Sequence, residues 1–185
     1  MDGARIFNAA VALETDVTSL TRPCDSVMFC LSKGLGAPVG SMLVGSREFI
    51  DRARSLRKLL GGGMRQAGIL AAAGLIALEK MPARLHEDHA NARLLAEFLE
   101  QIPGLSLDSS KVRTNILVVR IACADLDSAQ LALRLRQNGV LVGTIDPRTI
   151  RLLTHLDVSR DQIHRAARVF REVLEAFTPT SVLAP

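Results

Sequence analysis

The feature that most constrains this chain is a short apolar run that stops at a lysine and a glycine-rich segment. Residues 26–31 are rich in strand-forming side chains. Residues 34–40 then hold three glycines and a proline in seven positions, which excludes regular structure there. Lys33 stands at the break, so a strand end holds its aliphatic stem while the glycine backbone leaves space around its amine. The pattern predicts a strand followed by a tight loop.

Lys33 fits two interpretations. A partly desolvated lysine keeps more of its neutral form, which is the nucleophile in Schiff-base chemistry, and a rigid strand end is a suitable mount for it. The alternative is an ordinary solvated lysine in a loop between two strands. Taken alone, the segment favours this second interpretation. A catalytic role for Lys33 therefore requires further cofactor-binding and substrate-binding residues elsewhere in the chain.

Composition restricts the core and the environment of the chain. Its 185 residues are 48% hydrophobic, without Trp or Tyr and with six Phe, so the core is aliphatic and base stacking by aromatics is not expected. The three cysteines, Cys24, Cys30 and Cys123, fit neither a disulfide framework nor a metal site, which indicates a reducing, cytoplasmic compartment. The longest apolar run, residues 68–78, is too short to span a bilayer, so we expect no membrane partner.

Positive charge is concentrated in one segment. Six basic side chains less two acidic ones give +4 there, which equals the net charge of the whole chain. The residues are Arg47, Arg52, Arg54, Arg57, Lys58 and Arg65 against Glu48 and Asp51. Together with the glycines at 61–63, the segment fits contact with a phosphate ligand, an acidic partner subunit or nucleic acid, or a solvated helix face.

Periodicity and capping residues predict an α/β chain. We expect helices at residues 6–13, 46–60, 66–80, 83–101, 126–137 and 159–177, and strands at 26–31, 41–44, 105–108, 115–121, 140–143 and 149–154. Residues 66–80 show no polar face, which predicts burial against a sheet or a second subunit. Pro82 marks a boundary between domains at 1–81 and 82–177, and residues 178–185 are expected to form a disordered tail.

The histidines add little to the candidate chemistry. His86 and His89 are one turn apart on a helix without a further ligand at useful spacing, so we expect them to face solvent and predict no zinc site. His155 follows the strand at 149–154 and is placed near a site, whereas His164 is expected on the surface. The glycines after Lys33 do not form a dinucleotide fingerprint, because Pro38 interrupts the helix start that such a motif needs.

Four blocks resemble one enzyme family. Residues 2–9 (DGARIFNA), 32–41 (SKGLGAPVGS), 57–68 (RKLLGGGMRQAG) and 151–155 (RLLTH) are similar to successive blocks of the low-specificity L-threonine aldolases. The resemblance covers essentially the whole chain, but only the C-terminal half of that family. It implies a truncated fold-type I pyridoxal phosphate-dependent transferase fold, like that of aspartate aminotransferase, with the end of the large domain and the small C-terminal α/β domain. It also implies homodimers or homotetramers.

The resemblance implies a role for each candidate site residue. Lys33 would form the covalent bond to pyridoxal 5'-phosphate, and Asp2 would pair with its pyridine nitrogen. Arg5 and Arg151 would bind the substrate carboxylate. Positions near the cofactor are Ser32, Lys58 and Arg65. The implied reaction cleaves a small amino acid, L-threonine or L-allo-threonine, to glycine and acetaldehyde, with no nucleic acid involved.

The chain also departs from the family pattern. The N-terminal strands and helices of the large domain, the Gly-Thr phosphate-binding loop and the histidine that stacks on the cofactor have no counterpart in it. We therefore expect a long exposed apolar sheet edge and an incomplete catalyst when this chain is alone. Two alternatives stay open, another fold-type I lyase that performs β-elimination and a non-catalytic fragment that packs on a full-length partner.

Overall fold

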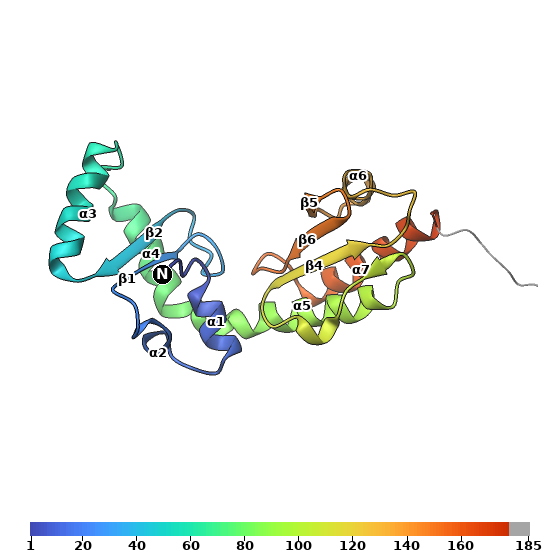
Figure 1. Ribbon diagram of the computed structural model, residues 1–185, viewed down its shortest axis with the longest axis horizontal. Coiled ribbons are helices and arrows are strands. Elements are labelled where there is room, and N and C mark those ends of the chain that lie inside the picture. Colours follow the sequence, from blue (N-terminus) through green and yellow to red (C-terminus); the bar gives the residue numbers. More distant parts are fainter. Residues whose placement is uncertain (178–185) are drawn as a thin grey trace, which may run out of the picture. The chain divides into compact units, whose positions relative to one another are not determined.

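The computed structural model describes residues 1–177 (Figure 1). The chain divides into two compact units, Met1–His86 and Glu87–Pro185. The tail expected at residues 178–185 lies outside the described residues. Within residues 1–177, no helix combines the length and apolarity required to cross a bilayer.

The first unit is built around a two-stranded sheet. Its elements are α1 (Ile6–Ala12), α2 (Val17–Thr21), β1 (Ser26–Cys30), β2 (Ser41–Gly45), α3 (Arg47–Leu59), α4 (Gly68–Lys80) and the 3-10 turn η1 (Pro82–Arg84). β1 and β2 are antiparallel, with Ser26 opposite Gly45 and Cys30 opposite Ser41. The first residues of the chain run parallel to β1, because the Gly3 N–H donates to the Met28 carbonyl at 2.7 Å.

The core of the first unit is small. Its central cluster of buried side chains is Leu31, Leu35, Ala37, Ala77 and Leu85. Phe7 and Phe29 pack against this cluster and meet each other edge to face, with ring centroids 5.6 Å apart. Val27 and Cys30, on opposite faces of β1, are also buried, whereas every residue of β2 is exposed. An isolated pair of strands is marginal in water, so this unit depends on the helices that reach the core.

Much apolar surface of the first unit is exposed. Every residue of β2 is exposed, and α3 has no buried residue. Of the two expectations for residues 66–80, burial against a sheet of this chain is wrong, since Ile69 is 85% exposed and α4 buries only Gly74 and Ala77, and burial against a second subunit stays a prediction. The reason is that a two-stranded sheet is too narrow to cover a helix that is apolar on all sides. The exposed apolar edge expected from the sequence is present.

The second unit is a four-stranded antiparallel sheet with helices packed on it (Figure 1). The strands are β3 (Leu105–Ser106), β4 (Ile116–Ile121), β5 (Gly143–Asp146) and β6 (Thr149–Leu153), in the order β3-β4-β6-β5. The helices are α5 (Leu85–Glu100), α6 (Ser128–Gln137) and α7 (Arg160–Glu175), with a 3-10 turn η2 (Ser109–Lys111). Alternate residues of β4 and β6 are buried, which places one face of the sheet against the helices.

Local sequence signals define the helices of the second unit. The predicted capping box at Ser159 is confirmed, because its side chain accepts from the Gln162 N–H while the Gln162 side chain accepts from the Ser159 N–H. Asp127 and Gln130 form the same arrangement at α6. These caps satisfy backbone donors that would otherwise lack partners, so the start of each helix is fixed locally.

The predicted strand at residues 140–143 is wrong, and the strand instead runs from Gly143 to Asp146. Gly139 has a positive φ of 80° and ends the helix, and the Val140 N–H donates back to the Leu135 carbonyl at 2.9 Å. This C-terminal helix cap occupies the donor that a strand would need. The chain therefore enters the sheet only after Val142.

Substitution of Leu135 by alanine is expected to lower the free energy of unfolding by about 2–5 kcal/mol, because this α6 side chain is fully buried. Leu133→Ala on the same helix is the matched control, since Leu133 is 58% exposed, and should change it by less than about 0.5 kcal/mol. Urea denaturation followed by circular dichroism measures both. Equal losses would show that the α6 face is assigned incorrectly.

Candidate functional site

The segment between β1 and β2 is a closed loop, residues 31–40, which we call the lysine loop. Three backbone bonds fold it: the Leu31 N–H donates to the Gly40 carbonyl at 3.0 Å, the Ala37 N–H to the Leu31 carbonyl at 3.0 Å, and the Gly36 N–H to the Lys33 carbonyl at 2.9 Å. Gly36 and Gly40 have φ of 71° and 118°, values that side-chain-bearing residues rarely adopt. The glycines of the sequence motif are thus required by the backbone turns.

Apolar side chains hold the lysine loop and leave Lys33 at its surface. Leu31, Leu35 and Ala37 are buried in the core of the first unit. Lys33 and Ser32 are exposed, and the Ser32 Oγ donates to the Gly40 carbonyl at 3.4 Å. The exposure of Lys33 agrees with the solvated loop lysine that the segment alone favours, and the described residues do not desolvate it. The loop fixes the backbone position of Lys33 but does not bury its side chain.

Asn8 of α1 lies against the lysine loop at Gly34. Its side chain is only 2% exposed, and a Cβ added to Gly34 would collide with the Asn8 Oδ1. Any larger residue at position 34 therefore forces Asn8 or the backbone next to Lys33 to move. Sequence reasoning missed Asn8, although an amide inside an otherwise apolar helix of the 2–9 block was a signal.

Asp2 lies on the backbone segment that runs parallel to β1. It is paired with Met28, and its Oδ1 accepts from the Ala4 N–H at 3.0 Å. Since the segment and β1 are parallel, both continue toward the same end of the sheet, where Lys33 follows Cys30. The structure thus places the predicted carboxylate on a segment paired with the strand that leads to the predicted amine. Arg5 comes next in the chain, half-buried at the start of α1.

Lys58 and Arg65 flank a glycine-rich connection between α3 and α4. Lys58 lies in the last turn of α3, where the Gly61 N–H donates to the Lys58 carbonyl at 3.1 Å. The side chains of Lys58 and Arg65 are both exposed. Gly61 has a φ of 81°, which ends the helix. The roles of Lys58 and Arg65 near a cofactor stay predictions.

Arg151 belongs to the second unit, on the open face of its sheet. Its neighbours Ile150 and Leu152 are buried while Arg151 is exposed, which confirms the predicted alternation along β6. Arg151 pairs with Val118 on β4 and with Gly143 on β5. Because Gly143 has no side chain, the guanidinium is left uncovered on that flank. A planar guanidinium can form two parallel hydrogen bonds to a small carboxylate. Binding of the substrate carboxylate by Arg151 stays a prediction.

The histidines only partly follow expectation. His86 is exposed and its Nδ1 lies 2.8 Å from the Ala83 carbonyl, but the expected exposure of His89 is wrong, because it is 2% exposed. His164 is exposed beside Phe98, as predicted, with ring centroids 5.2 Å apart. The His155 Nδ1 lies 3.4 Å from an Asp157 carboxylate oxygen. Within residues 1–177, no three His, Cys, Asp or Glu side chains gather as a metal site.

Gly34→Ala is expected to lower the free energy of unfolding by about 1–3 kcal/mol, because the new Cβ overlaps the Asn8 amide. Gly68→Ala is the matched control, since no atom lies within 4 Å of the Cβ position and alanine is the better helix former at the start of α4. Thermal unfolding compares the two variants. A Gly34→Ala protein as stable as the parent would contradict the packing of Asn8 under the loop.

Comparison with protein families places the chain among enzymes. Residues 1–122 match the model of the beta-eliminating lyase family. The low specificity L-threonine aldolase of Escherichia coli O157:H7 is 48% identical over 174 residues, which are 94% of this chain and 50% of that protein. Low-specificity L-threonine aldolase 1 of Arabidopsis thaliana is 42% identical over 175 residues, 94% of this chain and 49% of that protein.

Solved structures show the same fold. A threonine aldolase from Leishmania major superposes with a TM-score of 0.73 at 21% identity, covering 94% of this chain and 51% of that one. A PLP-dependent aminotransferase from Streptococcus suis gives a TM-score of 0.66 at 18% identity, covering 84% and 43%. The predicted fold-type I α/β architecture is therefore confirmed.

These matches confirm the resemblance stated from the four sequence blocks. The chain spans about half the length of the curated relatives that it matches. It belongs to the beta-eliminating lyase family, whose model matches residues 1–122.

Proposed function

We propose that this chain carries the lysine-bearing half of a pyridoxal phosphate-dependent threonine aldolase, which cleaves L-threonine or L-allo-threonine to glycine and acetaldehyde. The observation that supports the proposal is the position of Lys33 on the lysine loop. Its side chain is exposed on a loop closed by three backbone bonds, and this loop follows β1, the strand that pairs with the Asp2 segment. The chain is 48% identical to a threonine aldolase. A fixed backbone under an accessible amine is what a covalently bound aldehyde requires.

The residues fit the proposed cofactor. Lys33 offers an amine for its aldehyde, and Asp2 offers a carboxylate for its pyridine N–H. The Ala4 N–H already occupies the Asp2 Oδ1, which orients the carboxylate and leaves Oδ2 for a partner. Lys58 and Arg65 are the candidate cations for its phosphate. When bound, pyridoxal phosphate supplies an electron-accepting ring that stabilises negative charge at the substrate Cα.

Each proposed side chain has a separate task. Lys33 would hold the cofactor through its amine, and Asp2 would hold a proton at the ring nitrogen through a charge-assisted hydrogen bond. Arg5 of the first unit and Arg151 of the second are each a candidate for the substrate carboxylate, and binding it would set the orientation of the bond to be broken. The base that takes the hydroxyl proton is not assigned to any residue of this chain.

Two further functions are each favoured by one observation. The family model describes beta-eliminating lyases, which favours an elimination that uses the same lysine and carboxylate. The exposed apolar side chains of β2, α3 and α4 favour a fragment that packs on another chain. The same exposed side chains equally support assembly as a homodimer or homotetramer.

Cys24, Cys30 and Cys123 are free thiols, which supports a reducing, cytoplasmic compartment.

A chimera tests the proposal. The part of the Escherichia coli aldolase that lies outside the match is joined ahead of Met1, and threonine cleavage is followed by the release of glycine and acetaldehyde. Lys33→Ala should lower kcat/KM at least about 1,000-fold, as expected for loss of the covalent residue. Lys80→Ala at the exposed end of α4 is the matched control and should keep the parental rate.

Two outcomes of that assay contradict the proposal. Cleavage by the Lys33→Ala chimera at the parental rate would remove the role of this lysine. Formation of ammonia and a 2-oxo acid in place of glycine would assign the elimination reaction instead.

Arg151→Lys in the same chimera should raise KM for threonine about tenfold to a hundredfold with a smaller change in kcat, because lysine cannot form the bidentate pair with a carboxylate. Arg120→Lys is the control, since Arg120 is also exposed and lies two residues beyond Val118 on the same face of β4. Steady-state kinetics separate the two parameters. An unchanged KM would show that Arg151 does not bind the substrate.

A further inference from the structure

Gly34 lacks a side chain for a reason other than its backbone conformation. Gly36 and Gly40 of the lysine loop have φ of 71° and 118°, whereas Gly34 is not among the glycines of residues 1–177 with a positive φ. Gly34 is buried, although Lys33 immediately before it is exposed. A glycine that is not needed for a left-handed turn still loses backbone entropy on folding, so the remaining constraint at Gly34 is space.

Asn8 of α1 occupies the space that a side chain at Gly34 would need. The Cβ position of Gly34 collides with the Asn8 Oδ1 and lies 3.2 Å from the Asn8 Cγ and 3.4 Å from the Asn8 Nδ2. The three nearest atoms thus belong to one carboxamide, and Asn8 is only 2% exposed. Since Gly34 consists of backbone alone, this buried polar group lies directly against the backbone of the lysine loop.

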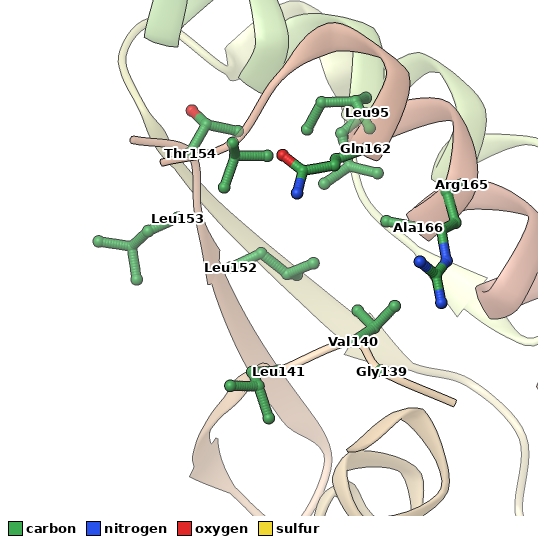
Figure 2. Close-up of a pocket in the computed structure, with 12 residues that line it drawn as sticks. Leu95, Gly139, Val140, Leu141, Leu152, Leu153, Thr154, Gln162, Arg165 and Ala166 are labelled. Carbon is green, nitrogen blue, oxygen red and sulfur yellow. The ribbon is translucent and has the colours of Figure 1, made fainter. Parts of the chain in front are cut away.

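Gly139 in the second unit is the opposite case. Its φ is 80°, and a Cβ there would lie 3.5 Å from the Arg165 Nη2, an ordinary contact with the end of a long side chain. Figure 2 shows both residues among those that line an apolar cleft. Gly139 is therefore required by its backbone conformation, and Gly34 by the side chain that lies on it.

The contact with Asn8 falls at a point that the backbone bonds of the lysine loop leave out. None of the three bonds that close the loop uses a group of Gly34. Gly34 lies between exposed Lys33 and buried Leu35, where the chain passes from the surface into the core. A contact at this residue restricts rotation of the peptide that joins it to Lys33, and this rotation sets the direction in which the lysine side chain leaves the loop.

The segment 2–8 contacts the rest of the first unit near both of its ends. Near its start, the Gly3 N–H donates to the Met28 carbonyl of β1 at 2.7 Å, and at its end Asn8 lies on Gly34. The candidate carboxylate and one candidate arginine belong to this same segment. The two contacts therefore join the segment with these side chains to the strand and to the loop that carry the candidate amine.

We propose that Asn8 is a positioning residue for Lys33, whose buried carboxamide holds the lysine loop at Gly34 and so limits the directions that the lysine side chain takes. Asn8 acts through the backbone and does not touch cofactor or substrate. The contact needs only residues of this chain, while its use in holding a cofactor rests on the proposed function. A lysine on a fixed backbone loses less conformational entropy when its amine is bound.

Amide hydrogen exchange on the 185-residue chain tests the contact without any cofactor. Asn8→Ala and Asn8→Leu should each speed exchange of the Gly36 and Ala37 amides at least about tenfold, because the loop opens locally more often. The Met28 amide, which donates to the Met1 carbonyl, should exchange as in the parent. Leucine has a branched shape like that of asparagine, so Asn8→Leu separates loss of the carboxamide from loss of volume.

Val11→Ala is the matched control, because Val11 is a partly buried residue of the same helix that packs against the core. It should lower the midpoint of thermal unfolding but leave the ratio of loop to Met28 exchange rates at the parental value. Gly34→Ala disturbs the contact from the loop side and should give the same exchange pattern as the Asn8 variants, so the test does not depend on the folding of one variant.

Binding of pyridoxal phosphate to the chimera described above is the second readout. Asn8→Leu should raise the dissociation constant of the cofactor about threefold to tenfold in a spectroscopic titration, as expected when one more side chain must be ordered. KM for threonine should stay within about twofold of the parental value, because Asn8 does not touch the substrate. A parental chimera that binds no cofactor would contradict the proposed function, and hydrogen exchange would still decide whether Asn8 holds the loop.

Three results would overturn the proposal. The first is parental exchange of the Gly36 and Ala37 amides in folded Asn8→Leu and Gly34→Ala proteins. The second is equal acceleration by Val11→Ala, which would show that general packing of α1 holds the loop. The third is a parental dissociation constant for the cofactor in the Asn8→Leu chimera when Lys33→Ala weakens binding, which would remove the role toward Lys33.

Discussion

The site depends on the parallel pairing between the first residues of the chain and β1. The Gly3 N–H donates to the Met28 carbonyl, and the Met28 N–H donates to the Met1 carbonyl, so Asp2 is held in line with the strand that leads to Lys33. The lysine loop then closes on itself within ten residues, from Leu31 to Gly40. The backbone segments that carry both proposed partners of the cofactor are therefore held by backbone hydrogen bonds, and buried Leu31, Leu35 and Ala37 hold the lysine loop further.

The two units differ in how far they satisfy their own apolar surface. The second unit has a continuous core in which Leu117, Val119 and Phe170 are completely buried. The first unit leaves β2 and most of α4 exposed, because two strands cannot cover the helices around them. We infer that the second unit is the more stable of the two, and that the first requires further strands, from its own chain or another, before Lys33 is enclosed.

Local signals in the sequence predicted most elements and much of the site. The glycines of the lysine loop, the cap at Ser159 and the alternation around Arg151 are each decided by a few neighbouring residues, so they were readable without tertiary information. Burial of α4 was not, because an apolar helix sequence does not say which surface covers it, and the two strands of the first unit leave most of it exposed. Asn8 and His89 were missed for a related reason, since their burial results from packing between segments distant in sequence.

Reduction with borohydride in the presence of pyridoxal phosphate, followed by peptide mapping, tests the role of Lys33 most directly. In the chimera completed by the Escherichia coli half, our account predicts that the reduced pyridoxyl group is found on Lys33, with Lys58, Lys80 and Lys111 of this chain unmodified. A stable adduct on one of those three lysines, with Lys33 unmodified, would contradict it.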